Sequence, residues 1–239
     1  MERKYSRGRI GETVTTNEGY IAECVDGGVK KGHVLVKIRD YLCEVQYFNF
    51  TRGTIKYPYH PSVFGKGMYG VGIYKGKTHK KMYATWQSML RRSYSHIYHK
   101  RQPTYKDVSV CEEWLDFQTF GKWFEENYVE GYALDKDLLV KGNKVYAPIT
   151  CVFIPQRLNN FLTNIQSTSI KGFIGAKFHK RNKKWNSSIN VNNKTRHLGT
   201  FDTKEEASKA YKVARAEQAE LLKLKYKDVL PQDILDKIK

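Results

Sequence analysis

The sequence predicts an α+β protein made of several small modules. Three patterns lead to this class: β-branched runs broken by glycine turns up to about Tyr57, helical spacing of apolar residues between Met82 and Tyr128, and strand-like alternation between Lys171 and Phe201. With 239 residues, the chain has room for two or three modules of roughly 60 to 100 residues. The expected segments are a barrel-like β module (1–57), a Gly-, Tyr- and Pro-rich linker (58–81), a mixed α/β module (82–165), a three-stranded antiparallel sheet packed on one helix (170–222) and a terminal tail (223–239).

The distribution of charge predicts a polyanionic partner. The chain carries a formal net charge of +18, and between Asp137 and Asp202 it has eleven Lys and Arg but no Asp or Glu. A folded surface normally mixes both signs to limit self-repulsion, so a long stretch of one sign indicates that a partner supplies the opposite charge. A content of 40% hydrophobic and 13% aromatic residues favours folded modules over a disordered basic tail. Nucleic acid is the partner we expect.

Other features argue against membrane, disulfide and zinc sites. No run approaches the ~18 apolar residues of a membrane span, and the first residues, MERKYSRGRIGE, contain no apolar signal core. We therefore expect a soluble, unexported, cytoplasmic protein without a membrane partner. The four cysteines are widely spaced and form no CxxC pair, so reduced thiols are expected at Cys24, Cys43, Cys111 and Cys151.

The first segment reads as β structure followed by an ordered linker. The runs YIAECV, HVLVKI and CEVQYFNF are separated by turn signals at 17–19 and 26–28, which predicts a small antiparallel barrel or curled sheet. Pro58 and Pro61 then interrupt any strand ladder. His60, between them, suits a structural role in a fixed turn better than a catalytic one.

The middle segment combines two helices with short strands. Apolar residues from Met82 to Tyr94 lie at i, i+4, i+7 and i+8, and a second helix is predicted from Glu112 to Tyr128 with aromatic residues along one stripe. After this helix, the sequence GYALDKDLLVKGNKVYAPITCVFIPQRLNNFL predicts a short strand, a turn at 142–143, another strand and an Asn-rich helix.

This segment resembles a nuclease pattern of bacteriophage HNH-type homing-endonuclease-like proteins. The matching positions are Leu134, Asp135, Asp137, Gly142, Asn143, Tyr146, Pro148, Cys151, Phe153, Asn159 and Asn160. The earlier phrase GTIKYPYHPSVFG, residues 53–65, resembles the N-terminal module of the same proteins. The resemblance implies Asp135, Asp137 and Asn143 as catalytic residues, with Asp135 and Asp137 holding Mg²⁺ or Mn²⁺ if the protein is a nuclease.

The expected general base is missing from this pattern. Lys136 stands where the resemblance implies a catalytic His, and a protonated lysine has no lone pair with which to take a proton. His96 and His99 lie upstream in a polar loop and are candidates for a base brought to the site by the fold. Two carboxylates without a base also suit the start of a turn in a degenerate scaffold, so the sequence leaves cleavage open.

The last module is predicted to present one apolar and one basic, amide-rich face. Side chains of a strand point alternately to opposite faces, which places Trp185, Ile189 and Val191 together and Asn186, Ser188 and Asn190 opposite. Leu198 is expected to point inward, with Thr195 and His197 outward. A helix start follows, with Asp202 or Thr203 as its cap and small residues that allow close packing on the apolar face.

This module resembles the Apetala/ethylene-response-factor DNA-binding domain. The resemblance is carried by Gly175, Trp185, Ile189, the run Leu198–Thr203, Glu205–Ala207, Ala210 and Tyr211. It implies a sheet that docks in the major groove of double-stranded DNA. Together with the alternation it predicts as DNA-binding residues Lys177, His179, Arg181, Asn186, Ser188, Asn190, Thr195, Arg196 and His197. Ile174 stands where plant members have Arg, so the target sequence does not transfer.

Two functions remain as alternatives. The first is a sequence-specific double-stranded DNA-binding protein of the phage homing-endonuclease-like type, with metal-dependent cleavage left open. The second is a non-enzymatic DNA-binding transcriptional regulator, which Lys136 favours. RNA binding is weaker because the basic face offers amides and charges rather than aromatic rings. The sequence predicts neither an oligomeric state nor a role for the N-terminal module.

Overall fold

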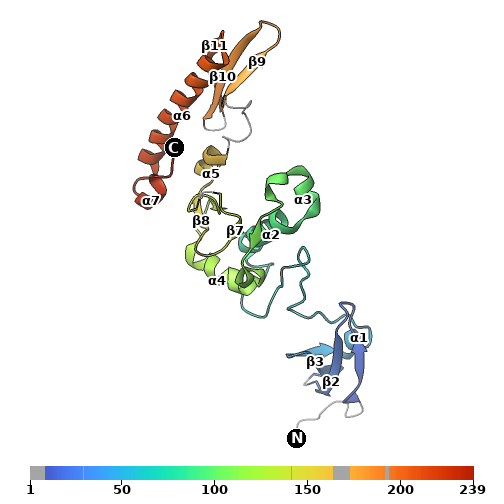
Figure 1. Ribbon diagram of the computed structural model, residues 1–239. Helices are drawn as coiled ribbons and strands as arrows, with labels where there is room; N and C mark the ends of the chain where they lie inside the picture. The colour runs from blue at the N-terminus through green and yellow to red at the C-terminus, as the bar shows by residue number, and fades with distance from the viewer. Residues whose placement is uncertain (1–8, 29, 141, 164–172, 192–193) are drawn as a thin grey trace. The chain divides into compact units, whose positions relative to one another are not determined.

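The computed structural model of the protein describes residues 9–28, 30–140, 142–163, 173–191 and 194–239. The chain divides into two compact units, Met1–Lys122 and Trp123–Lys239. Helices and sheets are mixed in it, which confirms the predicted α+β class (Figure 1). Within the described part of the chain, no helix has the length and apolar character that a membrane span needs. The four cysteines are free, as expected.

The N-terminal sheet is open rather than closed into a barrel. Its strands follow one another in the order β1-β2-β3-β4, each antiparallel to the next. One side of the sheet is apolar because alternate residues such as Val34, Val36 and Ile38 are buried, together with Phe50 of the following helix. The predicted barrel-like closure is therefore not formed by the described residues. The elements are β1 (Thr13–Thr15), β2 (Ile21–Gly27), β3 (His33–Ile38), β4 (Tyr41–Gln46) and α1 (Tyr47–Thr51).

The segment after this sheet is held by specific contacts. The Tyr57 hydroxyl donates to Asp40 Oδ1 at 2.9 Å, and His60 Nδ1 lies 3.0 Å from the hydroxyl of Tyr20. These hydrogen bonds give His60 a structural place in the turn between Pro58 and Pro61. The linker predicted from its Gly, Tyr and Pro content is thus ordered where it leaves the sheet.

The first unit continues with helices around a buried tryptophan. Trp86 lies in α2, is fully buried, and donates its Nε1–H to the carbonyl of Trp114 at 2.7 Å. The predicted helix over 82–94 is confirmed, but the single helix over 112–128 is wrong. Asp116 has extended φ and ψ there and its Oδ1 accepts from the Thr119 nitrogen at 2.8 Å, which starts a new helix. The elements are α2 (Lys80–Tyr94), α3 (His96–Arg101), the 3₁₀ turns η2 (Pro103–Tyr105) and η3 (Glu112–Leu115), β5 (Ser109–Val110) and α4 (Phe117–Asn127).

The second unit begins within α4, at Trp123, and continues with two short paired strands that pack on the C-terminal helices. β6 (Tyr132–Asp135) pairs with β8 (Val152–Pro155), and β7 (Val145–Tyr146) and α5 (Gln156–Thr163) complete this part. Its core combines residues of β8 and α5 with residues from far along the chain, in α6, in α7 and just outside α7: Ile154, Leu158, Phe161, Ala219, Leu222, Tyr226, Leu230, Ile234, Leu235 and Ile238. The C-terminal residues therefore contribute to a hydrophobic core.

The remaining strands form the predicted three-stranded antiparallel sheet in the order β11-β10-β9, with α6 along one face (Figure 1). Ile189 of β10 packs with Tyr211 and Ala214 of α6. Thr203, one of the two residues predicted as the cap, caps α6 in a capping box with Glu206. The elements are β9 (Ala176–His179), β10 (Lys184–Val191), β11 (Lys194–Phe201), α6 (Lys204–Tyr226) and α7 (Gln232–Leu235). Lys171, residues 192–193 and the segment boundary at 165–170 lie outside the described residues.

Candidate nucleic-acid interface

The carboxylates predicted as metal ligands lie in a tight turn at the end of β6. Asp135 is the last residue of this strand, and its Oδ1 accepts hydrogen bonds from the backbone nitrogens of Asp137 and Leu138 at 2.9 and 2.7 Å. Burial raises the pKa of the Asp135 carboxyl above its ordinary value, although the two backbone hydrogen bonds act in the opposite direction. The Asp135 carboxylate is therefore used to hold the turn.

Lys136 occupies the centre of this turn as a buried cation. Only 7% of the residue is exposed, and its Nζ donates to Asp137 Oδ1 at 2.6 Å and to the Asn143 carbonyl at 2.9 Å. The ammonium also lies 5.9 Å from the centroid of the Tyr146 ring. An ammonium donates hydrogen bonds and has no acceptor, so Lys136 neutralises Asp137 but does not replace an imidazole base.

Asn143 closes the same turn from the other side. Its Nδ2 donates to the carbonyls of Lys136 and Val145 at 2.8 and 2.6 Å, and its Oδ1 accepts from the Val145 nitrogen at 3.1 Å. The structure thus brings the three predicted catalytic residues, Asp135, Asp137 and Asn143, into one turn. Each of them is engaged in hydrogen bonds that shape that turn.

These residues do not fit a divalent metal ion. Mg²⁺ requires near-octahedral oxygen coordination, whereas an ammonium already binds an oxygen of Asp137 and the turn already uses Oδ1 of Asp135. Across the part of the chain that the structure describes, no three His, Cys, Asp or Glu side chains are grouped so that they could hold a metal. His96 and His99 lie on α3 in the other unit, where His99 Nε2 is 2.8 Å from the Arg92 carbonyl oxygen.

The sheet of β9, β10 and β11 leaves the face opposite α6 uncovered. Its register pairs Asn186 with Lys177 on one side and with Thr200 on the other, and it pairs Ser188 with His197. Residues that are paired across a sheet point to the same side, so these side chains share one surface. We call this surface the open face; it consists of Lys177, His179, Lys184, Asn186, Ser188, Asn190, Thr195, His197 and Thr200.

Two members of the open face, Lys184 and Thr200, are absent from the sequence-based prediction, and Thr200 points to this face because of a bulge in β11. Ser187 pairs with Gly199 but Ser188 pairs with His197, so β11 contains an extra residue at Leu198. This bulge reverses the alternation, and the Thr200 hydroxyl donates to Asn186 Oδ1 at 2.9 Å on the open face. A glycine inside a strand is a bulge signal, and Gly199 was therefore the feature that could have revealed it.

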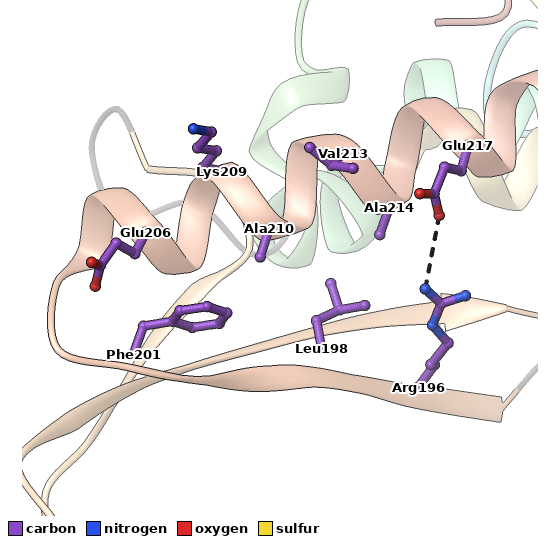
Figure 2. A pocket seen from close by; sticks show the side chains of 9 residues that line it. All are labelled: Arg196, Leu198, Phe201, Glu206, Lys209, Ala210, Val213, Ala214 and Glu217. Atoms are coloured by element: carbon purple, nitrogen blue, oxygen red, sulfur yellow. Dashed lines mark ion pairs between the residues drawn. The ribbon is translucent and has the colours of Figure 1, made fainter.

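Arg196 lies on the covered side of the sheet. It pairs with Ile189, whose side chain is buried under α6, and its Nη2 lies 3.8 Å from Glu217 Oε2 of α6. Figure 2 shows the pair at one end of a groove of about 520 Å³ between β11 and α6, with Leu198 on the strand side. Of the nine predicted DNA-binding residues, Arg196 is thus on the face opposite to the one expected.

Arg181 lies at the tip of the turn between β9 and β10. It is exposed together with Lys180 and Lys183, and Lys183 adopts a left-handed conformation with φ of 55°. Asn182 Oδ1 accepts from the Lys184 nitrogen at 3.3 Å and supports the turn. Three cations therefore project from one end of the sheet.

The predicted residues therefore occupy three places. Lys177, His179, Asn186, Ser188, Asn190, Thr195 and His197 share the open face, Arg181 is at its tip, and Arg196 is behind it. The chain matches no family model, no curated protein and no solved structure. Function must be inferred from the residues themselves.

Proposed function

We propose that the chain is a sequence-specific double-stranded DNA-binding protein of the phage homing-endonuclease-like type, and that its open face enters the major groove. The observation that carries this proposal is the chemistry of the open face, where amides, hydroxyls and cations share one side of the sheet. The major groove admits a β-ribbon, and there Asn can bond adenine while Lys can bond guanine. Asn190 and Lys177 are exposed members with these chemistries.

The placement of the aromatic residues favours duplex DNA over single-stranded RNA. Trp185 pairs with Phe178, and their ring centroids lie 5.1 Å apart. By the register, both side chains are on the side of Ala176 and Ser187, away from the open face. Single-strand recognition usually stacks bases on aromatic rings, and the open face contains no Phe, Tyr or Trp among its described residues.

The sheet is packed closely on α6, and this rigidity suits a surface that must fit a groove of fixed shape. Gly175 precedes β9 with φ of 78°, and a Cβ atom there would lie 2.1 Å from the Tyr211 ring, so strand and helix are in close contact. Arg215 of α6, which is 9% exposed, donates to the carbonyl of Phe161 at 3.1 Å and thereby fixes the same helix to α5. A site held on such packed elements keeps its side chains in register.

Binding without cleavage is the mode that the turn after β6 supports. Lys136 fills the space between Asp137 and Asn143, and the donor set does not fit Mg²⁺ or Mn²⁺. The proposed role is therefore that of a non-enzymatic DNA binder, such as a transcriptional regulator. Residues that resemble a nuclease pattern act here as scaffold.

Selection of bound duplexes from a random pool tests this proposal, followed by incubation of the selected duplex with Mg²⁺ or Mn²⁺. We expect a defined sequence preference and no strand break. Lys177→Ala and Arg181→Ala should each lower the slope of log affinity against log salt by about 0.9, because each removes one cation that neutralises a phosphate. Arg196→Ala removes the same charge from the covered side and is the matched control, with a smaller effect. An unselective pool, or slopes that do not respond to Lys177 and Arg181, would refute the assignment.

A further inference from the structure

The first unit contains a second acid-free stretch that is nearly as long as the one between Asp137 and Asp202. Between Glu44 and Asp107 there are twelve Lys and Arg and no Asp or Glu, over 62 residues. The stretch between Asp137 and Asp202 covers 64 residues with eleven Lys and Arg. The open face uses only the second stretch, so the positive charge of the first unit needs a separate explanation.

Six of these cations lie around α2 and α3 of the first unit. Lys75 and Lys77 precede α2, Lys80 and Lys81 form its first turn, Arg91 is in its last turn, and Arg101 ends α3; all six are exposed. We call them the α2 surface. At 1.5 Å per residue, Lys80 and Arg91 are separated by roughly 16 Å along the helix.

The exposed side of α2 is suited to close approach by a partner. Met82, Trp86, Met89 and Leu90 are buried on one side of the helix, so the opposite side faces outward. At 100° per residue, Lys81, Ala84, Ser88 and Arg91 lie on this outward side. Small residues between two groups of cations leave room for a backbone that contacts both groups.

Internal contacts do not account for these charges. Among the described residues, none of the lysines at 75, 77, 80 and 81 forms an ion pair, whereas Lys184 and Arg196 of the second unit pair with Asp202 and Glu217. Arg91 contacts the ring of Tyr98, at 5.5 Å from its centroid. Cations in the first turn of a helix also oppose its dipole, so Lys80 and Lys81 do not serve helix stability.

We propose that the α2 surface binds the phosphate backbone of double-stranded DNA without regard to base sequence. The proposal takes its partner from the proposed function, but it depends on different residues in a different unit. Duplex DNA carries one negative charge per about 1.7 Å of helix axis, so a 16 Å span of cations meets several phosphates. The open face would then choose the sequence, and the α2 surface would add affinity for any sequence.

The test is a full-length variant in which Lys75, Lys77, Lys80 and Lys81 are all changed to Gln, measured on a selected duplex and on a scrambled one. We expect affinity for both duplexes to fall by the same factor, and the salt slope to fall by up to about 3.6. The matched control changes Lys209, Lys212, Lys225 and Lys227, which are exposed on or just after α6, to Gln. It alters net charge equally and should change the slope far less.

The outcomes separate this inference from the proposed function. If the α2 variant lowers the slope but the wild-type protein shows no sequence preference, the proposed function fails and the α2 surface stands. If sequence preference is present and the α2 and control variants behave alike, the α2 surface is refuted. Vesicles of phosphatidylglycerol and phosphatidylcholine provide a further arm, because loss of vesicle binding with unchanged DNA binding would assign the surface to a membrane and overturn the proposal.

Discussion

The turn after β6 and the open face of β9, β10 and β11 contain the same kinds of side chain but use them in opposite ways. In the turn, Lys136 and Asn143 bond to neighbouring groups of the chain, and little of Lys136 is exposed. On the open face, Lys177 and Asn190 are exposed, and their side chains make no hydrogen bond or ion pair with a described residue. Polar groups that are satisfied internally stabilise structure, whereas exposed and unpaired groups of the same type are available to a partner.

The largest difference in unfolding free energy is expected between two glycine substitutions, one near the open face and one in the turn after β6. Gly175→Ala should lower the free energy of unfolding by about 3 kcal/mol, because a Cβ atom would overlap the Tyr211 ring and φ is positive. Gly142→Ala in the turn has a similar positive φ but nothing within 4 Å, so about 1 kcal/mol is expected. Chemical denaturation measures both. Equal losses would show that Tyr211 does not pack against Gly175.

Replacing one lysine in each region, Lys136 in the turn and Lys177 on the open face, tests directly whether the two regions differ in this way. Lys136→Ala should cost about 2 kcal/mol of unfolding free energy, because it leaves Asp137 and the Asn143 carbonyl without their donor; the cost is moderated because Asp137 is half-exposed. Lys177→Ala should change stability by less than about 0.5 kcal/mol.

DNA binding should show the reverse order for the same two variants. Lys177→Ala is expected to weaken DNA binding, and Lys136→Ala is expected to leave it unchanged as long as the unit remains folded. Denaturation and titration with duplex DNA supply the two readouts. If Lys136→Ala weakened binding in a folded protein, the turn would belong to the interface.

A serine pair tests which face of the sheet is covered. Ser187 is fully buried, and its hydroxyl has no hydrogen-bond partner among the described residues. Ser187→Ala should therefore raise the unfolding free energy by about 1 kcal/mol, since it removes an unsatisfied polar group. The neighbouring Ser188 is exposed on the open face, and Ser188→Ala should be nearly neutral. A reversed result would mean that the strand is out of register by one residue.

The smallest expected effect concerns the carboxyl of Asp135. Its pKa is raised in the folded protein, so the folded state holds this proton more tightly than the unfolded chain. This contribution to stability is present at low pH and is lost as the pH rises from the ordinary value of about 3.9 through the raised one. Asp135→Asn should therefore raise the unfolding free energy at neutral pH, and this gain should be lost in acid, where the carboxyl is protonated in both states. A gain that persisted in acid would contradict the role of burial.

Much of the fold was predictable because its signals are local. Helical spacing located α2, and the candidate cap residues Asp202 and Thr203 located the start of α6. The predicted helix over 112–128 failed at Asp116, whose side chain caps a new helix instead of continuing the old one. The barrel-like closure failed because closure depends on pairing between the first and last strands, which alternation within each strand does not specify.

The candidate site also has features that the sequence determined and features that only the tertiary structure decided. The sequence by itself determined the acid-free stretches and the alternation that gives β10 one apolar and one polar side, because both are properties of neighbouring residues. Only the tertiary structure decided that Arg196 faces α6, that Thr200 faces outward and that Lys136 binds Asp137 and Asn143. A bulge changes the direction of every residue beyond it, and a buried cation takes the partners that folding brings to it, so neither can be read from periodicity alone.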